Sequence, residues 1–386
     1  MVMKKLKELF QKETVLCIAL VLAVLSSFVV LPDKQYVDYI DFRTLAILFC
    51  LMCVMAGLQK LGLFQLIAER LLGRVKSCNA LRVILILLCF FFSMLITNDV
   101  ALITFVPFTF TVLKLLGDEG QRIMTIPVVV LQTVAANLGS MLTPIGNPQN
   151  LYLYAKSGLS IGSFLLLMLP YTLISLLLLL IADFLFARFG EMGKSAGLGF
   201  IISNEQKLNG GVKVLWVYLG MFVLCLLTVA HVVSVWITLA VVLVVQLLLD
   251  KEVLKRVDYS LLLTFVGFFV FIGNMGRIPA FSNFLQQIIV GNEVITSVVA
   301  SQAISNVPAA LLLSGFTENY EALIVGTNLG GLGTLIASMA SLISYKYIGK
   351  ESEKGVIGSK GKYLMTFTLV NICFLVVLMA VHMVIG

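Results

Sequence analysis

The sequence predicts an all-α polytopic membrane protein built from two inverted repeats, each with a re-entrant hairpin and a broken transmembrane helix. Hydrophobic residues make up 60% of the chain, charged residues make up 12%, and the mean hydropathy is +1.05. A chain of this composition cannot cover its apolar surface by folding as a soluble globule. In both halves, polar and Gly-rich segments interrupt the apolar sequence, which is typical of membrane proteins that build one binding site from two related halves.

The apolar runs are long enough to cross a hydrocarbon core, which needs about 20 residues per helix. We expect membrane helices over residues 15–31, 42–58, 162–186, 214–233, 234–249, 260–275 and 364–385. Two more apolar stretches, residues 123–154 and 321–347, contain Gly-rich polar segments and are predicted to be broken helices. The first run follows several lysines, as in a signal peptide, but no A-x-A-like cleavage site follows it, so we expect an uncleaved helix.

Two short polar segments inside apolar sequence are predicted to be the tips of re-entrant hairpins. They are Thr97-Asn98-Asp99, within residues 81–116, and Ser305-Asn306-Val307, within residues 294–316. The first arm of the second hairpin has about 12 residues and a length of roughly 18 Å, whereas the hydrocarbon core is about 30 Å thick. That arm is too short to span the membrane. The first hairpin has longer arms, so its length does not decide whether it spans the membrane. We predict that its turn is buried because no loop flanks the tip Thr97-Asn98-Asp99.

A Gly-rich segment follows each tip, from Asn137 to Asn150 in the first half and from Asn328 to Ser341 in the second. Residues that correspond between the halves are separated by a spacing that falls steadily from 217 to 191 positions. The pairs are Asp41 with Asp258, Gly57 with Gly273, Asn98 with Asn306, Asn137 with Asn328 and Thr143 with Thr334. When the crossings are counted, the first hairpin opens to the cytoplasm and the second to the outside, so the repeats are predicted to be inverted.

The repeats divide the chain into three parts. These are a first repeat at residues 1–189, a cytoplasmic linker at 190–212 and a second repeat at 213–386. The linker is polar and contains several Gly and Ser residues, as flexible connections do. The helix expected at 234–249 has no counterpart in the first half.

Short amphipathic stretches precede the two hairpins, at residues 60–76 and 277–290. Their apolar residues fall on one side of a helix, so we expect them to lie along opposite faces of the membrane. Two interpretations are open: they are simple surface connectors, or they are arms that join a fixed scaffold to a moving unit.

The distribution of Lys and Arg predicts the orientation, because these residues favour the cytoplasmic side. With a cytoplasmic N-terminus, 23 of the 27 basic residues fall inside, and only Lys34, Arg43, Lys156 and Arg277 fall outside. We therefore expect a multi-pass protein of the plasma membrane, typically the bacterial inner membrane. The same bias explains the net charge of +7 without a nucleic-acid partner.

Helix N-termini at the tips and breaks are expected to bind an anion without a charged side chain, because their N–H groups are unsatisfied and carry about half a positive charge. Asn98 and Asn306 are good N-cap residues, and Asn147 before Pro148 has the pattern of an N-cap with a first-turn proline. Exposed carbonyls and side-chain oxygens are expected to bind a cation. The cation candidates are Asn98, Asp99, Asn137, Thr143, Asn306, Asn328 and Thr334. Alternatively, these side chains only satisfy the local backbone of kinked helices.

Asp99 is the single carboxylate of the four polar segments. A carboxylate near the middle of a bilayer costs on the order of 3 kcal/mol, so it is expected to be functional. We interpret Asp99 as a group that couples transport to a cation or a proton; the alternative is that it only complements a helix dipole. Asp183 lies beside Arg188 near a helix end and is expected to be structural.

These motifs resemble the ion transporter superfamily, which includes the divalent anion/sodium symporters, the citrate permeases and the arsenite pumps. The resemblance rests on a hairpin tip followed by a Thr-Pro or Gly-Thr break in each half, and it covers most of the chain. It implies a homodimer that works as an elevator. It also implies substrate and ion contacts at Thr97, Asn98, Ser305 and Asn306, with Thr143, Asn147, Thr334 and Ser338 lining the broken helices. The family tips read Ser-Asn-Thr, so Asp99 and Val307 depart from the pattern and put dicarboxylate specificity in doubt.

We expect a secondary transporter of a di- or tricarboxylate or an inorganic oxyanion, driven by Na⁺ or H⁺. The residues expected to contact the substrate are Thr97, Asn98, Asn147, Asn150, Ser305, Asn306 and Ser338. Arsenite-type efflux, Na⁺/H⁺ antiport and a passive channel are alternatives. The expected partners are the small anion and membrane lipid; no cofactor and no metal other than Na⁺ is expected. An enzyme is not expected, because the sequence shows no His cluster and no activated nucleophile.

Overall fold

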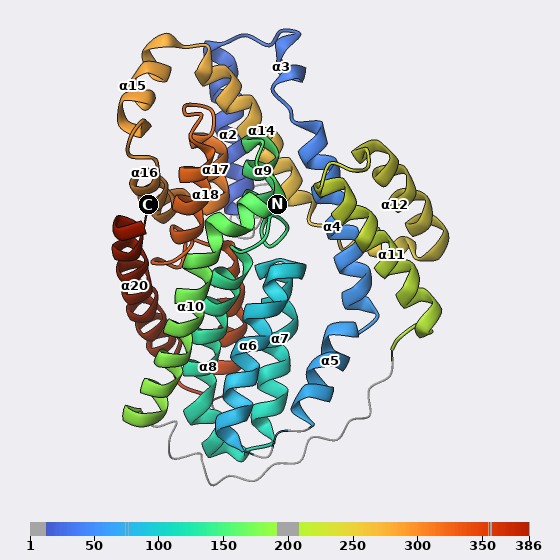
Figure 1. Cartoon of the computed structure of the whole chain (residues 1–386), viewed down its shortest axis with the longest axis vertical. Helices are drawn as coiled ribbons and strands as arrows, with labels where there is room; N and C mark the ends of the chain where they lie inside the picture. The colour runs from blue at the N-terminus through green and yellow to red at the C-terminus, as the bar shows by residue number, and fades with distance from the viewer. Residues whose placement is uncertain are drawn as a thin grey trace, which may run out of the picture.

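The structure is a computed structural model, and it describes residues 13–73, 75, 77–190, 208–353, 355 and 357–385. Every regular element within these residues is a helix (Figure 1). Seven of the described helices are long and apolar enough to cross a membrane, or up to eight if the bent pair α15 (Pro279–Ile289) and α16 (Glu293–Ile304) counts as one span. The chain is therefore a polytopic α-helical membrane protein, as its composition predicts.

The first half of the chain contains α2 (Thr14–Val29), α3 (Gln35–Asp38), α4 (Phe42–Lys60), α5 (Leu63–Leu72), α6 (Cys78–Ile96), α7 (Asn98–Lys114), α8 (Gly117–Ser140), α9 (Pro148–Ser157) and α10 (Ile161–Phe189). Each helix that the sequence predicts in this half is present, with ends that shift by a few residues. The predicted broken helix at 123–154 is the pair α8 and α9, which are separated by residues 141–147, called here the first break.

The second half contains α11 (Gly211–Val229), α12 (Val235–Leu249), α13 (Lys251–Leu254), α14 (Tyr259–Gly276), α15, α16, α17 (Asn306–Leu313), α18 (Tyr320–Leu329), α19 (Met339–Ser352) and α20 (Lys360–Ile385). The predicted broken helix at 321–347 is the pair α18 and α19, separated by residues 330–338, called here the second break. Most of the predicted linker, residues 191–207, lies outside the described residues, as do the lysines before residue 13.

Five helices, α2, α4, α11, α12 and α14, pack together in a first group that we call the flanking helices. Helix α2 packs on α14, whereas α11 and α12 pack on α4 (Figure 1). Small residues allow these approaches, as in other membrane helix pairs. Gly57 of α4 lies against the ring of Tyr218 on α11, and a Cβ atom there would overlap the ring; a Cβ atom at Gly267 of α14 would lie 3.0 Å from Ala19 of α2. The opening helix of each half thus packs on a helix of the other half.

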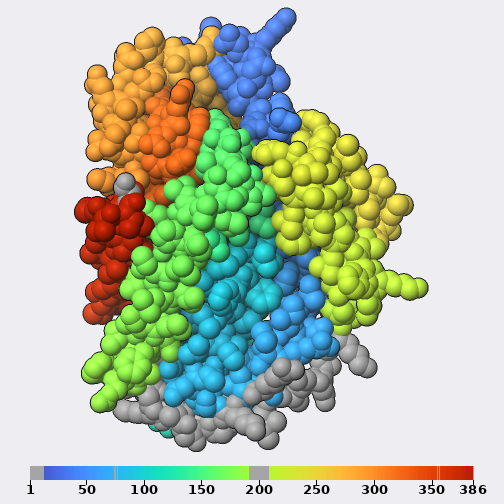
Figure 2. All heavy atoms as spheres, viewed as in Figure 1, coloured from blue at the N-terminus to red at the C-terminus, as the bar shows by residue number. Residues whose placement is uncertain are grey.

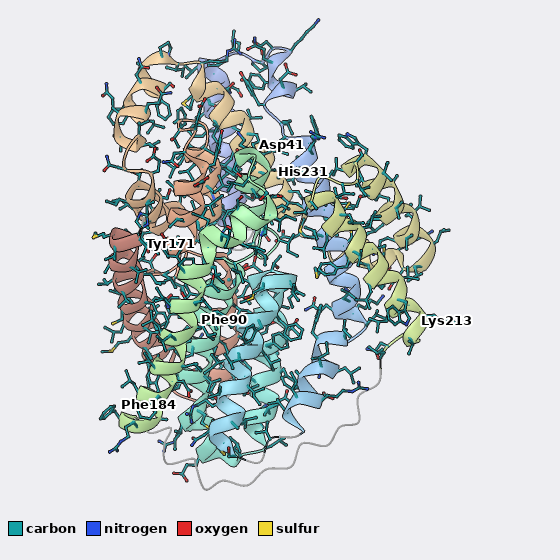
Figure 3. All side chains as sticks on the ribbon, in the orientation of Figure 1. Asp41, Phe90, Tyr171, Phe184, Lys213 and His231 are labelled. Carbon is teal, nitrogen blue, oxygen red and sulfur yellow. The ribbon has the colours of Figure 1, made fainter. Side chains whose placement is uncertain are left out.

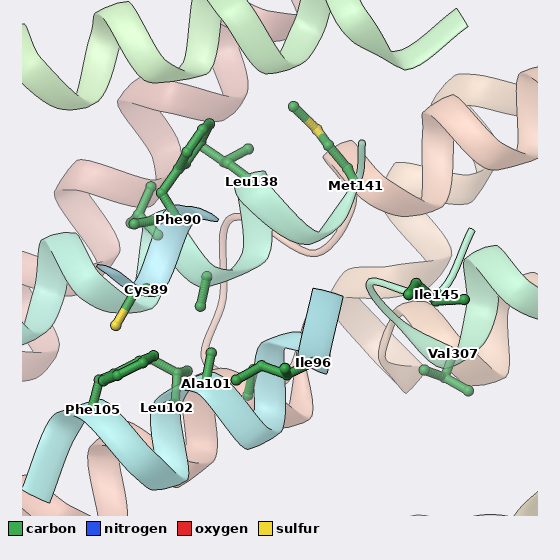
Figure 4. Packing of buried hydrophobic residues seen from close by; sticks show 14 of the residues in the cluster. Cys89, Phe90, Ile96, Ala101, Leu102, Phe105, Leu138, Met141, Ile145 and Val307 are labelled. Carbon is green, nitrogen blue, oxygen red and sulfur yellow. The ribbon is translucent and has the colours of Figure 1, made fainter. Parts of the chain in front are cut away.

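The helices that carry the polar segments pack together as a second group, α6 to α9 and α16 to α19, which we call the central helices. Helix α8 packs on both α6 and α7, and α18 packs on both α16 and α17. Buried apolar side chains fill the space between α6, α7 and α8, among them Phe90, Leu102, Phe105 and Leu138 (Figure 4). A Cβ atom at Gly139 would come within 2.0 Å of the Phe90 carbonyl oxygen, so the backbones of α6 and α8 touch there.

A buried ion pair fastens α6 to α10. Arg82 donates to both carboxylate oxygens of Asp183, over 2.5 Å from Nε and 2.9 Å from the second guanidinium nitrogen, and it also donates to Asn79 over 3.0 Å. Both charged side chains are buried. The sequence placed Asp183 beside Arg188, but the structure pairs it with Arg82, because one guanidinium of α6 faces the carboxylate across the helix interface. A buried carboxylate requires such a partner.

Candidate functional site

A single residue joins the two helices of each predicted hairpin. Thr97 separates α6 from α7, and Ser305 separates α16 from α17. Thr97 has φ and ψ of 71° and 151°, and Ser305 has 75° and 155°. This region is populated almost only by glycine, and a non-glycine residue there costs about 1–3 kcal/mol and is typical of functional sites. The N-caps of α7 and α17 are therefore Thr97 and Ser305, not the Asn98 and Asn306 that the sequence suggested.

Each tip forms a backbone hydrogen bond with the break of its own half. The N–H of Asn98 donates to the carbonyl of Gly146 over 3.1 Å, and the N–H of Asn306 donates to the carbonyl of Ala337 over 2.9 Å. Both asparagines are the first residue of a helix, so these N–H groups have no partner within the helix. The two halves therefore dock tip to break with the same contact.

Asn137, near the end of α8, joins the first tip to the second break. Its Oδ1 accepts hydrogen bonds from Asn98 Nδ2 over 3.1 Å and from Ser338 Oγ over 3.0 Å. Its Nδ2 lies 3.5 Å from the carbonyl of Gly331 and 3.4 Å from Ser341 Oγ. Since the Asn137 side chain is buried, it depends on these partners. Three of the predicted site residues therefore meet at one amide.

A second set of buried amides joins the first break to α18. Asn147 caps α9 as the sequence predicts, with Oδ1 accepting from the N–H of Asn150 over 2.9 Å and Pro148 at the first helical position. Asn147 Nδ2 donates to Asn328 Oδ1 over 3.0 Å, and Asn328 Nδ2 donates to Asn150 Oδ1 over 2.5 Å. Residues predicted from both halves thus form one connected polar cluster inside the central helices.

The two predicted threonines of the breaks, Thr143 and Thr334, lie at the edges of this cluster and not within it. Thr143 Oγ1 donates to the carbonyl of Met94 over 2.5 Å, and Thr334 Oγ1 lies 3.4 Å from the carbonyl of Gln302. Thr143 is partly buried and Thr334 is exposed. Each threonine ties a break to the helix that leads into the tip of the same half.

Gln302 is a further candidate residue, which the sequence analysis missed. Its Nε2 donates to the carbonyls of Gly330 and Leu332 over 3.0 and 2.9 Å, and its Oε1 accepts from the N–H of Thr334 over 2.8 Å. In the first half, Asn150 Nδ2 satisfies break carbonyls instead, including that of Thr143 over 3.1 Å. A glutamine four residues before Asn306 in an otherwise apolar arm is the signal that was available.

Asp99 has a carboxylate oxygen without a partner. Its own N–H is bonded to Asn98 Oδ1 over 3.0 Å, but its Oδ1 is buried and accepts no hydrogen bond from any described residue. Among the described residues, no Lys or Arg forms an ion pair with it. An isolated buried carboxylate is costly unless a proton or a cation neutralises it. The second tip has Val307 at this position, so the two tips differ in charge.

The site as a whole is a neutral polar cluster with one acidic group at its edge. Its donors are side-chain amide and hydroxyl groups, and the four polar segments contain no Lys or Arg. The N–H groups of Asn98 and Asn306 are already bonded to the breaks, and α9 begins with Pro148, which has no N–H. The side-chain donors suit a small polar or anionic solute, since they do not hold it by a fixed salt bridge.

Comparison with known proteins identifies relatives along most of the chain. A family model described as a citrate transporter matches residues 7–321. The inner membrane protein YbiR of Escherichia coli is 30% identical over 325 residues, which cover 83% of this chain and 84% of that protein. An uncharacterized transporter of Methanocaldococcus jannaschii is 31% identical over 356 residues, covering 91% and 92%. A silicon efflux transporter of Oryza sativa subsp. japonica is 33% identical over 142 residues, covering 37% and 28%.

Proposed function

The chain belongs to the citrate transporter family, within the ion transporter superfamily, and from this membership we propose that it is a secondary active transporter of a small anion. The substrate class is a di- or tricarboxylate or an inorganic oxyanion. One observation carries the proposal: buried amides of both halves, centred on Asn137 and Asn328, join the first tip to the second break and the first break to α18. A cluster shared by two halves changes shape when either half moves, which is what a carrier requires.

The anion binds between the two tips and the two breaks. Its donors are side-chain amides and hydroxyls, together with N–H groups in the first turns of α7, α9 and α17 other than those of Asn98 and Asn306, which are bonded to the breaks. Helix N-termini favour negative charge, and the effect is strongest where water is excluded. The residues assigned to the anion are Thr97, Asn98, Asn147, Asn150, Ser305, Asn306 and Ser338.

The two halves act as inverted repeats with re-entrant hairpins, α6–α7 and α16–α17. Asp41 and Asp258 cap α4 and α14 with the same φ and ψ of −78° and 82°, which supports a repeat. Helix α16 has 12 residues, or roughly 18 Å, and bends by 111° from α15, so it does not continue into a full span. In an elevator mechanism the flanking helices are fixed and the central helices move. The N-terminus lies in the cytoplasm, and the assembly is a homodimer.

Coupling to Na⁺ or H⁺ takes place at the first tip. The free carboxylate oxygen of Asp99 supplies the negative charge, and nearby oxygens of the tips and breaks complete a cation site when the ion is Na⁺. Asn98, Asn137 and Thr143 are assigned to this role in the first half, with Asn306, Asn328 and Thr334 as their counterparts.

Arsenite-type efflux is the second candidate, and Asp99 is the observation that favours it. Arsenite is neutral at pH 7, so a carboxylate beside the site does not repel it. Na⁺/H⁺ antiport is weaker, because Asp99 is the single acidic residue of the four polar segments. A passive channel would not need strained tips that are docked on breaks. Catalysis is disfavoured because the two histidines of the described residues contact Tyr154 and Tyr171 and not the serines of this cluster.

Uptake into proteoliposomes tests the proposal. Citrate, succinate, sulfate, phosphate and arsenite are compared with and without a Na⁺ or pH gradient. We expect a gradient to drive at least one of these solutes, and the double variant Asn98→Ala/Asn306→Ala to abolish that uptake. The matched control is Asn283→Ala, at an exposed position of α15, which should transport at the normal rate. Gradient-independent leakage, or full uptake by the double variant, would contradict the proposal.

A further inference from the structure

We propose that a cavity between the flanking helices and α9 is an entrance site that binds a small polyvalent anion, either a carboxylate or an oxyanion. The inference rests on the proposed function, since it takes the transported class of anion as the ligand. The cavity has a volume of about 260 Å³. Its lining includes Asp41, Arg43, Tyr154, His231 and Ser234, none of which belongs to the tips or breaks.

The walls of this entrance site come from both groups of helices. Arg43 lies at the start of α4, and His231 lies in the turn between α11 and α12, so both belong to the flanking part. Tyr154 lies on α9, which directly follows the first break. Asp41, two residues before Arg43 in the chain, and His231 lie close together above the middle of the molecule in Figure 3. In Figure 2, the green segment that contains α9 meets the yellow-green α11–α12 segment on the same face. An anion bound here contacts fixed and moving parts at once.

Arg43 places a positive charge at the cavity wall and has no ion-pair partner among the described residues. The carboxylate of Asp41 also lines the cavity, but both of its oxygens are bound to Thr44, accepting from its N–H over 3.0 Å and from its Oγ1 over 2.6 Å. An arginine without a partner at a cavity wall is well suited to bind a carboxylate or an oxyanion, because its planar donors match two oxygens.

The predicted orientation places three other basic residues, Lys34, Lys156 and Arg277, on the outer side of the membrane together with Arg43. Each of them either has another partner or lies away from the cavity. Arg277 pairs with Asp33 over 2.8 Å, and Lys156 lies over the ring of Tyr152. Lys34 is exposed at the start of α3 and does not line the cavity. Arg43 is therefore the one of these four cations that is available at the cavity.

Helix α12 and His231 add donors on the opposite wall. Ser234 is the N-cap of α12 and makes no capping hydrogen bond through its side chain, so the first N–H groups of this 15-residue helix lack a protein partner at the cavity. His231 has a φ of 59° and stacks on Tyr154, with ring centroids 5.9 Å apart and an interplanar angle of 20°. The stacking fixes the imidazole at the cavity wall, where a ring N–H donates to an anion.

Tryptophan fluorescence tests this site, because the chain has only two tryptophans. Trp236 lies in the first turn of α12, directly after the lining residues Ser234 and Val235, whereas Trp216 lies on α11 outside the cavity lining. In a Trp216→Phe background, titration with citrate or sulfate should change the emission of Trp236 in a saturable way. Glycerol, an uncharged probe, should not change it.

Arg43→Gln should raise the half-saturating anion concentration about tenfold, as expected for the loss of one charge-assisted contact. Arg43→Lys should give a half-saturating concentration between those of the wild type and Arg43→Gln, which would show that the lost charge and not a folding defect is responsible. Lys34→Gln, an exposed cation at the same end, should leave the titration unchanged. An unchanged titration with Arg43→Gln, or no response at anion concentrations that saturate transport, would overturn the site.

The transport-site variant Asn98→Ala/Asn306→Ala separates this inference from the proposed function. It should lose uptake but keep the Trp236 response, because its substitutions lie outside the cavity lining. If no anion is transported while the Trp236 fluorescence response still depends on Arg43, the entrance site is supported and the proposed function is wrong. If an anion is transported but the Trp236 fluorescence response is the same with and without Arg43, the proposed function is supported and the entrance site is wrong.

Discussion

Thr97 and Ser305 hold nearly the same unusual backbone conformation in opposite halves of the chain, with φ values of 71° and 75° and ψ values of 151° and 155°. The asparagine after each residue donates its backbone N–H to the break of its own half, at Gly146 and Ala337. Strain that occurs twice at corresponding places, with the same docking contact, indicates a geometry that the surrounding packing maintains for function.

Glycine at the second tip should stabilise the fold but impair transport. Ser305→Gly removes backbone strain of about 1–3 kcal/mol, and the added entropy of the unfolded chain offsets about 0.5–1 kcal/mol of this gain. We expect a higher Tm in detergent than for Ser305→Ala, which keeps the strain. Both variants lose the hydroxyl and should transport more slowly. A glycine variant that unfolds below the alanine variant would show that the tip is not strained.

Removal of the central amide should cost both stability and transport. Asn137→Ala leaves the buried groups of Asn98, Ser338 and Ser341 without their partner, and each lost buried partner costs about 1–3 kcal/mol. We expect a clear fall in Tm and loss of uptake. Asn137→Asp keeps the acceptor for Asn98 and Ser338 and should fold better than the alanine variant. Equal losses in the two variants would argue against this oxygen as the junction of the halves.

Neutralisation of Asp99 should uncouple transport from its driving ion. With Asp99→Asn, the side chain no longer attracts a proton or Na⁺, so uptake should lose its dependence on the pH or Na⁺ gradient while exchange continues. The measurement is initial uptake rate against pH and Na⁺ concentration. Asp118→Asn, on the exposed first turn of α8, is the control and should behave as the wild type. Unchanged ion dependence in Asp99→Asn would remove the coupling role.

Loss of Arg82 alone should destabilise the fold more than loss of Arg82 and Asp183 together. Arg82→Met alone leaves a buried, unpaired carboxylate, and breaking such a pair costs about 3–5 kcal/mol. The double variant Arg82→Met/Asp183→Leu removes both charges and should recover most of that loss. Thermal unfolding of the single and double variants gives the coupling energy. If the double variant is no more stable than Arg82→Met, the pair is not what joins α6 to α10.

The ion pair between Lys60 and Asp250 should give a small, pH-dependent contribution to stability. A hydrogen bond from the Lys60 ammonium holds the pKa of the Asp250 carboxyl below its usual range. The contribution is therefore present above the unfolded pKa of about 3.9 and is lost as the pH falls through the lower folded pKa. Because both side chains are partly exposed, we expect Lys60→Met to cost less than about 1 kcal/mol at pH 7 and low salt. An effect that persists in strong acid or in high salt would contradict this origin.

The membrane class, the broken helices and the position of both tips could be predicted, because they depend on local composition and on helix-breaking residues. Asn147 before Pro148 is an N-cap in the structure, as its local pattern predicts. The assignment of the N-caps at Asn98 and Asn306 was one residue late, because propensity cannot show that Thr97 and Ser305 adopt a strained conformation.

The partners of the polar residues could not be predicted. Asn137 meets Ser338 and Asn147 meets Asn328 only because the two halves pack together, and no local pattern encodes that register. Gln302 was missed for the same reason, since its partners are backbone groups of the second break. The roles of these residues in binding and coupling stay predictions.

Counterflow in proteoliposomes tests the central claim most directly. Vesicles that contain the protein are preloaded with the unlabelled anion that gives the fastest uptake, and the entry of its labelled form is followed without an ion gradient. A carrier that alternates access through the tip-and-break site should accelerate labelled uptake and show a transient overshoot, which Asn98→Ala/Asn306→Ala abolishes. Entry that ignores the internal anion, at equal rates in wild type and variant, would contradict the account.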